Sequence, residues 1–189
     1  MSHRTGTSAR TLDPTASHDV FEDLQNDSKG FQELSSILRD RAGIHLPENS
    51  KNLCLMASRL NPIMRNLGIS TYFDYLNYLR SNGEAAFQCF VEAMTTNTTH
   101  FFREAKHFEV LREELGEILK QKRATGQLEL RIWCAAASTG QEVYTLAMVL
   151  HESIPDIARW NIRFLATDID HHVLEKAAKG VYSEADRKS

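Results

Sequence analysis

The hydrophobic positions between residues 21 and 95 recur with the period of α-helices. In four successive segments the apolar residues stand three or four positions apart, which gathers them on one face of a helix. In chain order these residues are Phe31, Leu34, Ile37 and Leu38; Leu53, Met56, Leu60, Ile63, Met64 and Leu67; Tyr72, Leu76 and Leu79; and Phe87, Phe90, Val91 and Met94. Because short connections join the segments, the pattern predicts a small all-α bundle over residues 21–95.

A longer helical pattern covers residues 104–123 and follows a polar stretch. Its apolar face is formed by Phe108, Leu111, Leu115 and Ile118. We therefore expect residues 96–126 to form a polar loop and a helix that connects two domains.

The period changes from helical to alternating after residue 126. Leu128, Leu130, Ile132 and Cys134 alternate with Glu129, Arg131 and Trp133, which predicts a half-buried strand. A helix opened by Gly140, a second strand over residues 162–167 and a helix over residues 173–178 follow. This order predicts a right-handed parallel unit, and hence the start of an α/β Rossmann-like domain over residues 127–189.

Two strands are too few to cover the faces and edges of a parallel sheet. We therefore expect this second domain to be incomplete in the present chain.

The composition is that of a soluble globular protein, with 42% hydrophobic and 25% charged residues among 189. A net charge of -3 argues against a general nucleic-acid binder. Residues 1–20 are rich in Ser, Thr, Asp and Arg without periodicity and are predicted to be a disordered tail. The chain shows neither a transmembrane run nor a secretory signal, which favours a cytoplasmic protein.

The cysteines and histidines do not indicate a metal site. Cys54, Cys89 and Cys134 are widely spaced in apolar patterns, which predicts buried free thiols in a reducing compartment. The eight histidines lack the spacing of zinc ligands, so no metal is expected.

Candidate ligand-binding residues follow both predicted strands. The segment 135–140 is made of small and hydroxyl residues, which let a ligand approach the backbone. Asp168 could accept hydrogen bonds from the two hydroxyls of a ribose, or either Asp168 or Asp170 could cap the next helix. Glu142 could balance an ammonium or sulfonium charge, or could simply favour the positive start of its helix.

Three motifs, in this order, resemble those of the bacterial chemotaxis receptor methyltransferases. The first is Thr-Asn-x-Thr-x-Phe-Phe-Arg-Glu from Thr96, and the second is Trp-x-Ala-Ala-Ala-Ser-Thr-Gly-x-Glu-x-Tyr from Trp133. The third is Asp-Ile-Asp-x-x-Val-Leu-Glu-Lys-Ala from Asp168. The resemblance covers about residues 30–182, although Gln141 and Val143 replace an acidic residue and a proline that are common in the family.

The resemblance implies an enzyme that methylates glutamate side chains of chemoreceptors with S-adenosyl-L-methionine and releases S-adenosyl-L-homocysteine. It implies that the cofactor contacts are Asn97, Thr99, Arg103, Ala136, Glu142 and Asp168. Arg103 would also be catalytic, because the family places it beside the methyl donor, where it would orient the incoming carboxylate. The fold implied is an all-α bundle followed by a Rossmann-like methyltransferase domain.

Members of this family continue through further strands that complete the adenine pocket. The resemblance therefore implies a C-terminally incomplete chain with weak cofactor binding and little or no methyl transfer. Two alternatives remain open, namely a receptor-binding module without catalysis and a Rossmann-type methyltransferase for small molecules or nucleic acid.

The helical half carries a basic surface. Residues 28–68 contain six basic and three acidic residues, a net charge of +3 in a chain of -3. On the predicted second helix, Lys51, Arg59 and Arg65 lie opposite the apolar stripe. They could form an ordinary solvated face, or a docking surface for the acidic cytoplasmic helices of chemoreceptors.

Overall fold

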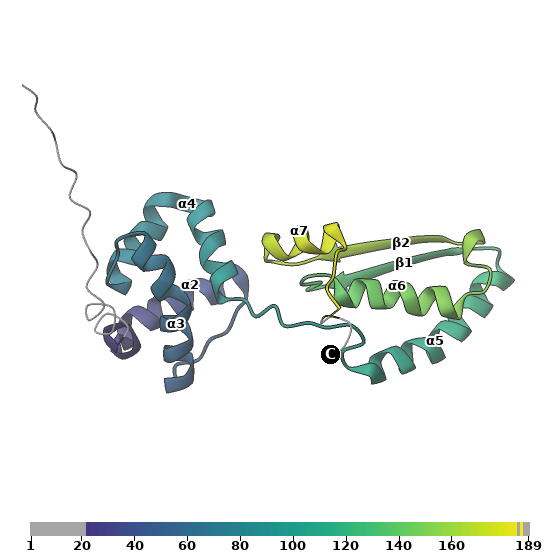
Figure 1. Cartoon of the computed structure of the whole chain (residues 1–189), viewed down its shortest axis with the longest axis horizontal. Coiled ribbons are helices and arrows are strands. Elements are labelled where there is room, and N and C mark those ends of the chain that lie inside the picture. Colours follow the sequence, from purple (N-terminus) through teal and green to yellow (C-terminus); the bar gives the residue numbers. More distant parts are fainter. Residues whose placement is uncertain (1–21, 185, 187–189) are drawn as a thin grey trace, which may run out of the picture. The chain divides into compact units, whose positions relative to one another are not determined.

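The computed structural model describes residues 22–184 and residue 186. Contacts divide the chain into two compact units that meet between Met94 and Thr95 (Figure 1). The predicted disordered tail, residues 1–20, lies outside the described residues. None of the described helices has the length and apolar character needed to cross a bilayer.

The first unit is helical, as predicted. Helical residues 22–26 are followed by α2 (Ser28–Ala42), α3 (Ser50–Asn66) and α4 (Tyr72–Met94). Their apolar stripes form one core, and its largest side chains with almost no solvent exposure include Phe31, Leu34, Leu38, Met56, Leu60, Met64, Tyr72 and Phe90.

Local signals set the ends of these helices. Asp27 and Asn49 accept backbone N–H bonds at the starts of α2 and α3, which supplies acceptors for groups that the helix leaves unpaired. The third and fourth predicted helices together make up α4, and a kink at Gly83 separates them. Gly83 has φ 62° and ψ −144°, a conformation that glycine adopts readily because it has no Cβ.

The second unit alternates helices and strands. Its elements are α5 (Ala105–Ala124), β1 (Glu129–Ala135), α6 (Gln141–Ser153), a short 3₁₀ helix η1 (Ile157–Arg159), β2 (Asn161–Thr167) and α7 (His171–Lys179). The two strands pair in parallel, with Glu129 opposite Asn161 and Ala135 opposite Thr167. The expected fold class, a helical bundle followed by the start of a Rossmann-like domain, is thereby confirmed.

The two faces of this sheet differ in cover. Leu130 of β1 packs with apolar residues of α5 and α6, among them Leu115 and Leu150. Trp133 and Leu165, which are register partners on the opposite face, are 68% and 58% exposed. The second unit therefore has one covered sheet face and one bare face.

The expectation for the cysteines was partly wrong. Only Cys134 is buried, whereas Cys54 and Cys89 are exposed, and all three are free thiols. Cys54 and Cys89 stand within helical patterns, but their positions fall outside the faces that the bundle buries.

Candidate functional site

The polar loop of the first motif is fastened to the turn between β1 and α6. The Ser138 hydroxyl donates to the main-chain oxygen of Asn97 at 2.8 Å. Further along the same motif, the Phe102 N–H donates to the hydroxyl of the fully buried Thr145 at 3.2 Å. Segments 41 to 43 residues apart in the sequence are thus held at the carboxyl end of β1, where ligands bind in sheets of this class.

Both motif segments contain unusual backbone conformations. The described non-glycine residues with positive φ are Phe102, Glu104, Ala136 and Ser138, with values between 49° and 60°. Such residues cost conformational energy and concentrate at binding sites and catalytic sites. All four lie in the first two motifs, which marks these segments as the candidate site without reference to any relative.

The structure separates the roles of two aspartates that the sequence left open. Asp170 caps α7, because its Oδ1 accepts the N–H groups of His172 at 2.9 Å and Val173 at 3.3 Å. The half-buried Asp168 instead accepts the N–H of Ser138 at 2.8 Å and that of Asp170 at 2.9 Å. Its carboxylate retains further lone pairs, so hydrogen bonds from a diol remain compatible with this arrangement.

Glu142 lies in the first turn of α6 with an exposed carboxylate. Its Oε1 is 3.2 Å from the sulfur of the buried Cys134. Burial, together with the hydrogen bond to Glu142 and the charges of Glu142 and Asp168, raises the pKa of the Cys134 thiol to about 12. The thiol therefore stays protonated and donates to Glu142, and both candidate carboxylates lie near this one sulfur.

The remaining candidate residues of this unit occupy the loop and the turn. The guanidinium of the exposed Arg103 donates to the Thr98 carbonyl at 2.9 Å, within the same loop. Thr99 is half-buried, and the exposed Ala136 has φ 60°. The Asn97 amide nitrogen lies 2.6 Å from Oδ2 of Asp170.

Tyr182 is a contact residue that we did not single out from the sequence. Its hydroxyl donates to the Thr139 carbonyl at 2.7 Å, and its ring meets those of Phe101 and Tyr144 at centroid distances of 5.0 and 5.6 Å. A Cβ on Gly140 would stand 2.6 Å from the Tyr182 hydroxyl. Tyr182 thus ties the segment after α7 to the first two motifs, which no local periodicity could reveal.

The three basic residues of α3 have different surroundings. Lys51 in the first turn and Arg65 in the last turn are exposed. Arg59 is half-buried and donates to the Met94 carbonyl at 2.6 Å and, at 3.5 Å, to that of Ala93. Arg59 therefore supplies a hydrogen-bond donor to the end of α4, which its position opposite the apolar stripe did not predict.

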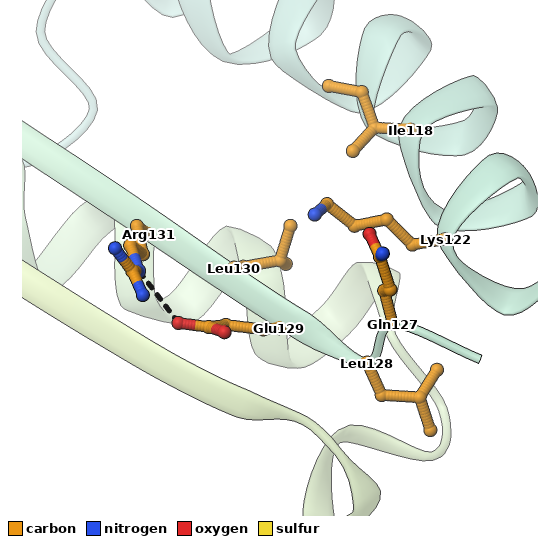
Figure 2. Close-up of a pocket in the computed structure, with 7 residues that line it drawn as sticks. All are labelled: Ile118, Lys122, Gln127, Leu128, Glu129, Leu130 and Arg131. Atoms are coloured by element: carbon orange, nitrogen blue, oxygen red, sulfur yellow. Dashed lines mark hydrogen bonds and ion pairs between the residues drawn. The ribbon is translucent and has the colours of Figure 1, made fainter. Parts of the chain in front are cut away.

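A surface hollow occurs at the other end of β1 (Figure 2). Its lining comes from α5, through Ile118 and Lys122, and from residues 127–131 at the start of β1. Arg131 and Glu129 pair with each other there at 2.7 Å. None of the motif residues lines this hollow, so it is distinct from the candidate site.

Within the described residues, no cluster of three or more His, Cys, Asp or Glu side chains could hold a metal ion. The candidate site therefore consists of small residues, hydroxyls, an amide, a guanidinium and the carboxylates Glu142 and Asp168. Two carboxylates beside a close-approach backbone suit an organic ligand with positive charge and hydroxyl groups.

Comparison with known families matches both units. Residues 29–95 match the all-alpha domain of CheR methyltransferases, and residues 97–188 match their SAM-binding domain. These two ranges correspond to the helical unit and the α/β unit, respectively.

Similar proteins carry related names. The chemotaxis protein methyltransferase of Escherichia coli K12 is 38% identical over 161 residues, which are 84% of this chain and 52% of that protein. The probable chemotaxis protein methyltransferase of Rhizobium etli is 42% identical over 146 residues, covering 76% and 53%. The chemotaxis protein methyltransferase of Klebsiella aerogenes is 35% identical over 190 residues, which are 100% of this chain and 61% of that protein.

The chain spans about half the length of the first two of these relatives. The resemblance inferred from the three motifs is confirmed by the matches to both domain models. The chain belongs to the CheR methyltransferase family.

Proposed function

We propose that this chain provides the receptor-docking and cofactor-binding parts of an S-adenosylmethionine-dependent protein-glutamate methyltransferase of bacterial chemotaxis. The observation that carries the proposal is the hydrogen-bonded joining of all three motifs, through Asn97, Ser138 and Asp168, at the carboxyl ends of the two strands. Chemotaxis methyltransferases among the relatives support the same role.

The donor and acceptor groups of the site suit S-adenosyl-L-methionine. We assign the exposed carboxylate of Glu142 to the positive charge of the cofactor and the half-buried carboxylate of Asp168 to its ribose hydroxyls. Ala136, which is exposed and has a small side chain, leaves the backbone open to close approach. Thr99 and Asn97 add polar groups from the loop.

The cofactor supplies an activated methyl group on a positively charged sulfur. A glutamate substrate is already ionised near pH 7, so the protein needs no general base. Catalysis then depends on position and on partial desolvation of the carboxylate. We assign orientation of this carboxylate to Arg103, whose exposed guanidinium lies on the loop of the first motif.

Calorimetric titration with S-adenosyl-L-homocysteine tests the cofactor site. Asp168→Ala and Glu142→Gln should each weaken binding about ten-fold or more, because each removes a charge-assisted contact. Glu113→Gln on the exposed surface of α5 is the matched control and should bind like the parent chain. Equal affinity in all four proteins would refute the assignment of both carboxylates.

We expect these 189 residues by themselves to bind the cofactor weakly and to transfer methyl groups slowly or not at all. The reason is that the sheet has two strands within the described residues, and one of its faces leaves Trp133 and Leu165 exposed. Tight binding by the isolated chain would contradict this expectation. Binding of receptor fragments without any binding of cofactor would instead support a docking module.

We assign receptor docking to the basic face of α3, with the acidic cytoplasmic helices of chemoreceptors as partner. Lys51 and Arg65 are the informative positions, because replacing Arg59 would also remove a contact to the end of α4. The double charge reversal of Lys51 and Arg65 to Glu should weaken binding of an acidic, glutamate-bearing helical peptide, most strongly at low salt. Lys120→Glu on α5 is the control, and a loss of the same size there would reject a specific basic face.

A further inference from the structure

Asp170 is a buried carboxylate with more partners than a helix cap needs. It is 5% exposed. Its Oδ1 accepts the two N–H groups at the start of α7, while its Oδ2 lies 2.6 Å from the Asn97 amide nitrogen and 3.4 Å from the Thr95 hydroxyl. One carboxylate thus joins the first motif to the helix that follows β2.

These contacts determine which end of the Asn97 amide is engaged. A carboxylate can only accept hydrogen bonds, so the amide nitrogen must face Asp170. The same nitrogen is 3.4 Å from the Thr95 hydroxyl. The side-chain oxygen of Asn97 makes no hydrogen bond within the described part of the chain, and it is the group that remains for a ligand.

The cap role alone does not account for this arrangement. Serine or threonine caps helices about as well as aspartate and carries a single side-chain oxygen. The second oxygen of Asp170 is directed to residues 73 and 75 positions earlier. A buried charge is also costly unless donors surround it, and half of its donors here come from the polar loop.

We propose that Asp170 is a positioning residue of the cofactor site, which holds Asn97 so that its side-chain oxygen is presented to the ligand. Asn97 then acts as an acceptor and binds a hydrogen-bond donor of the cofactor, such as its ammonium, amino or hydroxyl group. This inference rests on the proposed function, because it takes the ligand at Asn97 to be S-adenosylmethionine or its product.

Two substitutions separate positioning from capping. Asp170→Ser retains a cap for α7 but cannot reach the loop. Asp170→Asn retains both the cap and the size of the side chain. If its amide oxygen caps α7, its nitrogen replaces Oδ2 opposite the Asn97 nitrogen, and the two donors force the Asn97 amide to turn over.

Asp27→Ser is the matched control. Asp27 caps α2 by accepting the Gly30 N–H at 2.8 Å, so the same change removes a carboxylate from a helix start in the other unit. Asp27→Ser should leave both the Asn97 amide signals and the binding of S-adenosyl-L-homocysteine as they are in the parent chain.

The first readout requires no ligand. In ¹⁵N NMR spectra, the side-chain amide protons of Asn97 should be shifted downfield and exchange slowly in the parent chain, and Asp170→Ser should abolish both features. The second readout is titration of the labelled chain with S-adenosyl-L-homocysteine up to millimolar concentration. Both Asp170 variants should bind about ten-fold more weakly, since a charge-assisted hydrogen bond no longer fixes the acceptor.

The outcomes distinguish this inference from the proposed function. If the parent chain binds the ligand and Asn97→Ala weakens binding, but both Asp170 variants bind normally, Asp170 has no positioning role and the cofactor site stands. If Asp170→Ser leaves the Asn97 signals unchanged, the contact itself is refuted. If the parent chain shows no binding at all, the proposed function fails and this inference fails with it.

Discussion

The helical unit and the α/β unit differ in how completely they bury their own apolar surface. The bundle encloses one core, whose central residues Leu34, Leu60 and Phe90 have no solvent exposure. The α/β unit packs helices on one face of its sheet and leaves Trp133 and Leu165 of the other face in solvent. The candidate cofactor site nevertheless lies in the unit with the exposed sheet face.

This difference in burial shows that the contacts that hold the site are not those that stabilise a buried core. The site is held by polar contacts from the loop of the first motif, among them Asn97 with Ser138 and Phe102 with Thr145 of α6. These contacts require only the carboxyl ends of two strands and the start of α6. The core of the bundle, by contrast, depends on apolar side chains from α2, α3 and α4 together.

The same leucine-to-alanine change in both units tests this comparison most strongly. Leu60→Ala should destabilise the bundle by about 2–5 kcal/mol, because a fully buried side chain is lost and a cavity remains. Leu165→Ala, at an exposed position of β2, should change stability by less than about 0.5 kcal/mol. Urea unfolding followed at amides of each unit measures both, and equal losses would contradict the difference in burial.

The contact of Arg59 with the end of α4 gives the next largest expected effect. Arg59→Ala should lower the free energy of unfolding of the bundle by about 1–3 kcal/mol, because two backbone carbonyls lose a charged donor. Arg65→Ala, six residues later in the same helix and exposed, should change it by less than about 0.5 kcal/mol. Similar values for the two variants in thermal unfolding would mean that the Arg59 contact does not stabilise the unit.

Replacing two glycines of the α/β unit by alanine should change its stability in opposite directions. Gly140 has φ +95°, and a Cβ there would stand 2.6 Å from the Tyr182 hydroxyl and 2.9 Å from the Ala177 Cβ. Gly140→Ala should therefore destabilise the unit by about 1–3 kcal/mol. Gly116→Ala within α5, where a Cβ meets open space, should stabilise it by about 0.5–1 kcal/mol. Denaturant unfolding that gave both changes the same sign would refute this turn geometry.

Alkaline pH should weaken the α/β unit before the bundle. Burial raises the pKa of Cys134 from 9.0 to about 12, so the folded state keeps the proton while the unfolded thiol loses it. The stability from this group is complete below pH 9 and is lost progressively as pH rises towards 12. By pH 10 the loss should be about 1 kcal/mol.

In the bundle, burial raises the pKa values of Tyr72 and Tyr75 above their ordinary value of 10.0, so their effect begins one pH unit later. Unfolding of each unit measured between pH 7 and 10 should show this order. Cys134→Ala should remove the early loss in the α/β unit, and persistence of that loss in the variant would assign it to other groups.

Periodicity alone predicted the bundle and the two strands. The stripes from Phe31 to Met94 correspond to α2, α3 and α4, and the alternation from Leu128 to Cys134 corresponds to β1. The two helices expected within residues 72–94 are likewise present, separated by the non-helical conformation of Gly83 inside α4. The exposure of Cys54 and Cys89 escaped prediction, because apolar neighbours do not define which helix face is covered.

The candidate site could be predicted only as a set of segments. The position of segment 135–140 after a strand follows from the order of elements, and the resemblance to a known family supplied the residues. Which residues contact the second carboxylate oxygen of Asp170, and which basic residue of α3 is engaged by the end of α4, depended on contacts over 35 to 75 positions.

By itself, the sequence determined the kind of each element, the order of the elements and the class of domain, because hydrophobic spacing acts over neighbouring residues. Only the tertiary structure decided the partners of Asp170, Arg59 and Tyr182. A hydrogen bond or ring contact between distant segments depends on how the folded chain brings them together, and the spacing of neighbouring residues does not specify this.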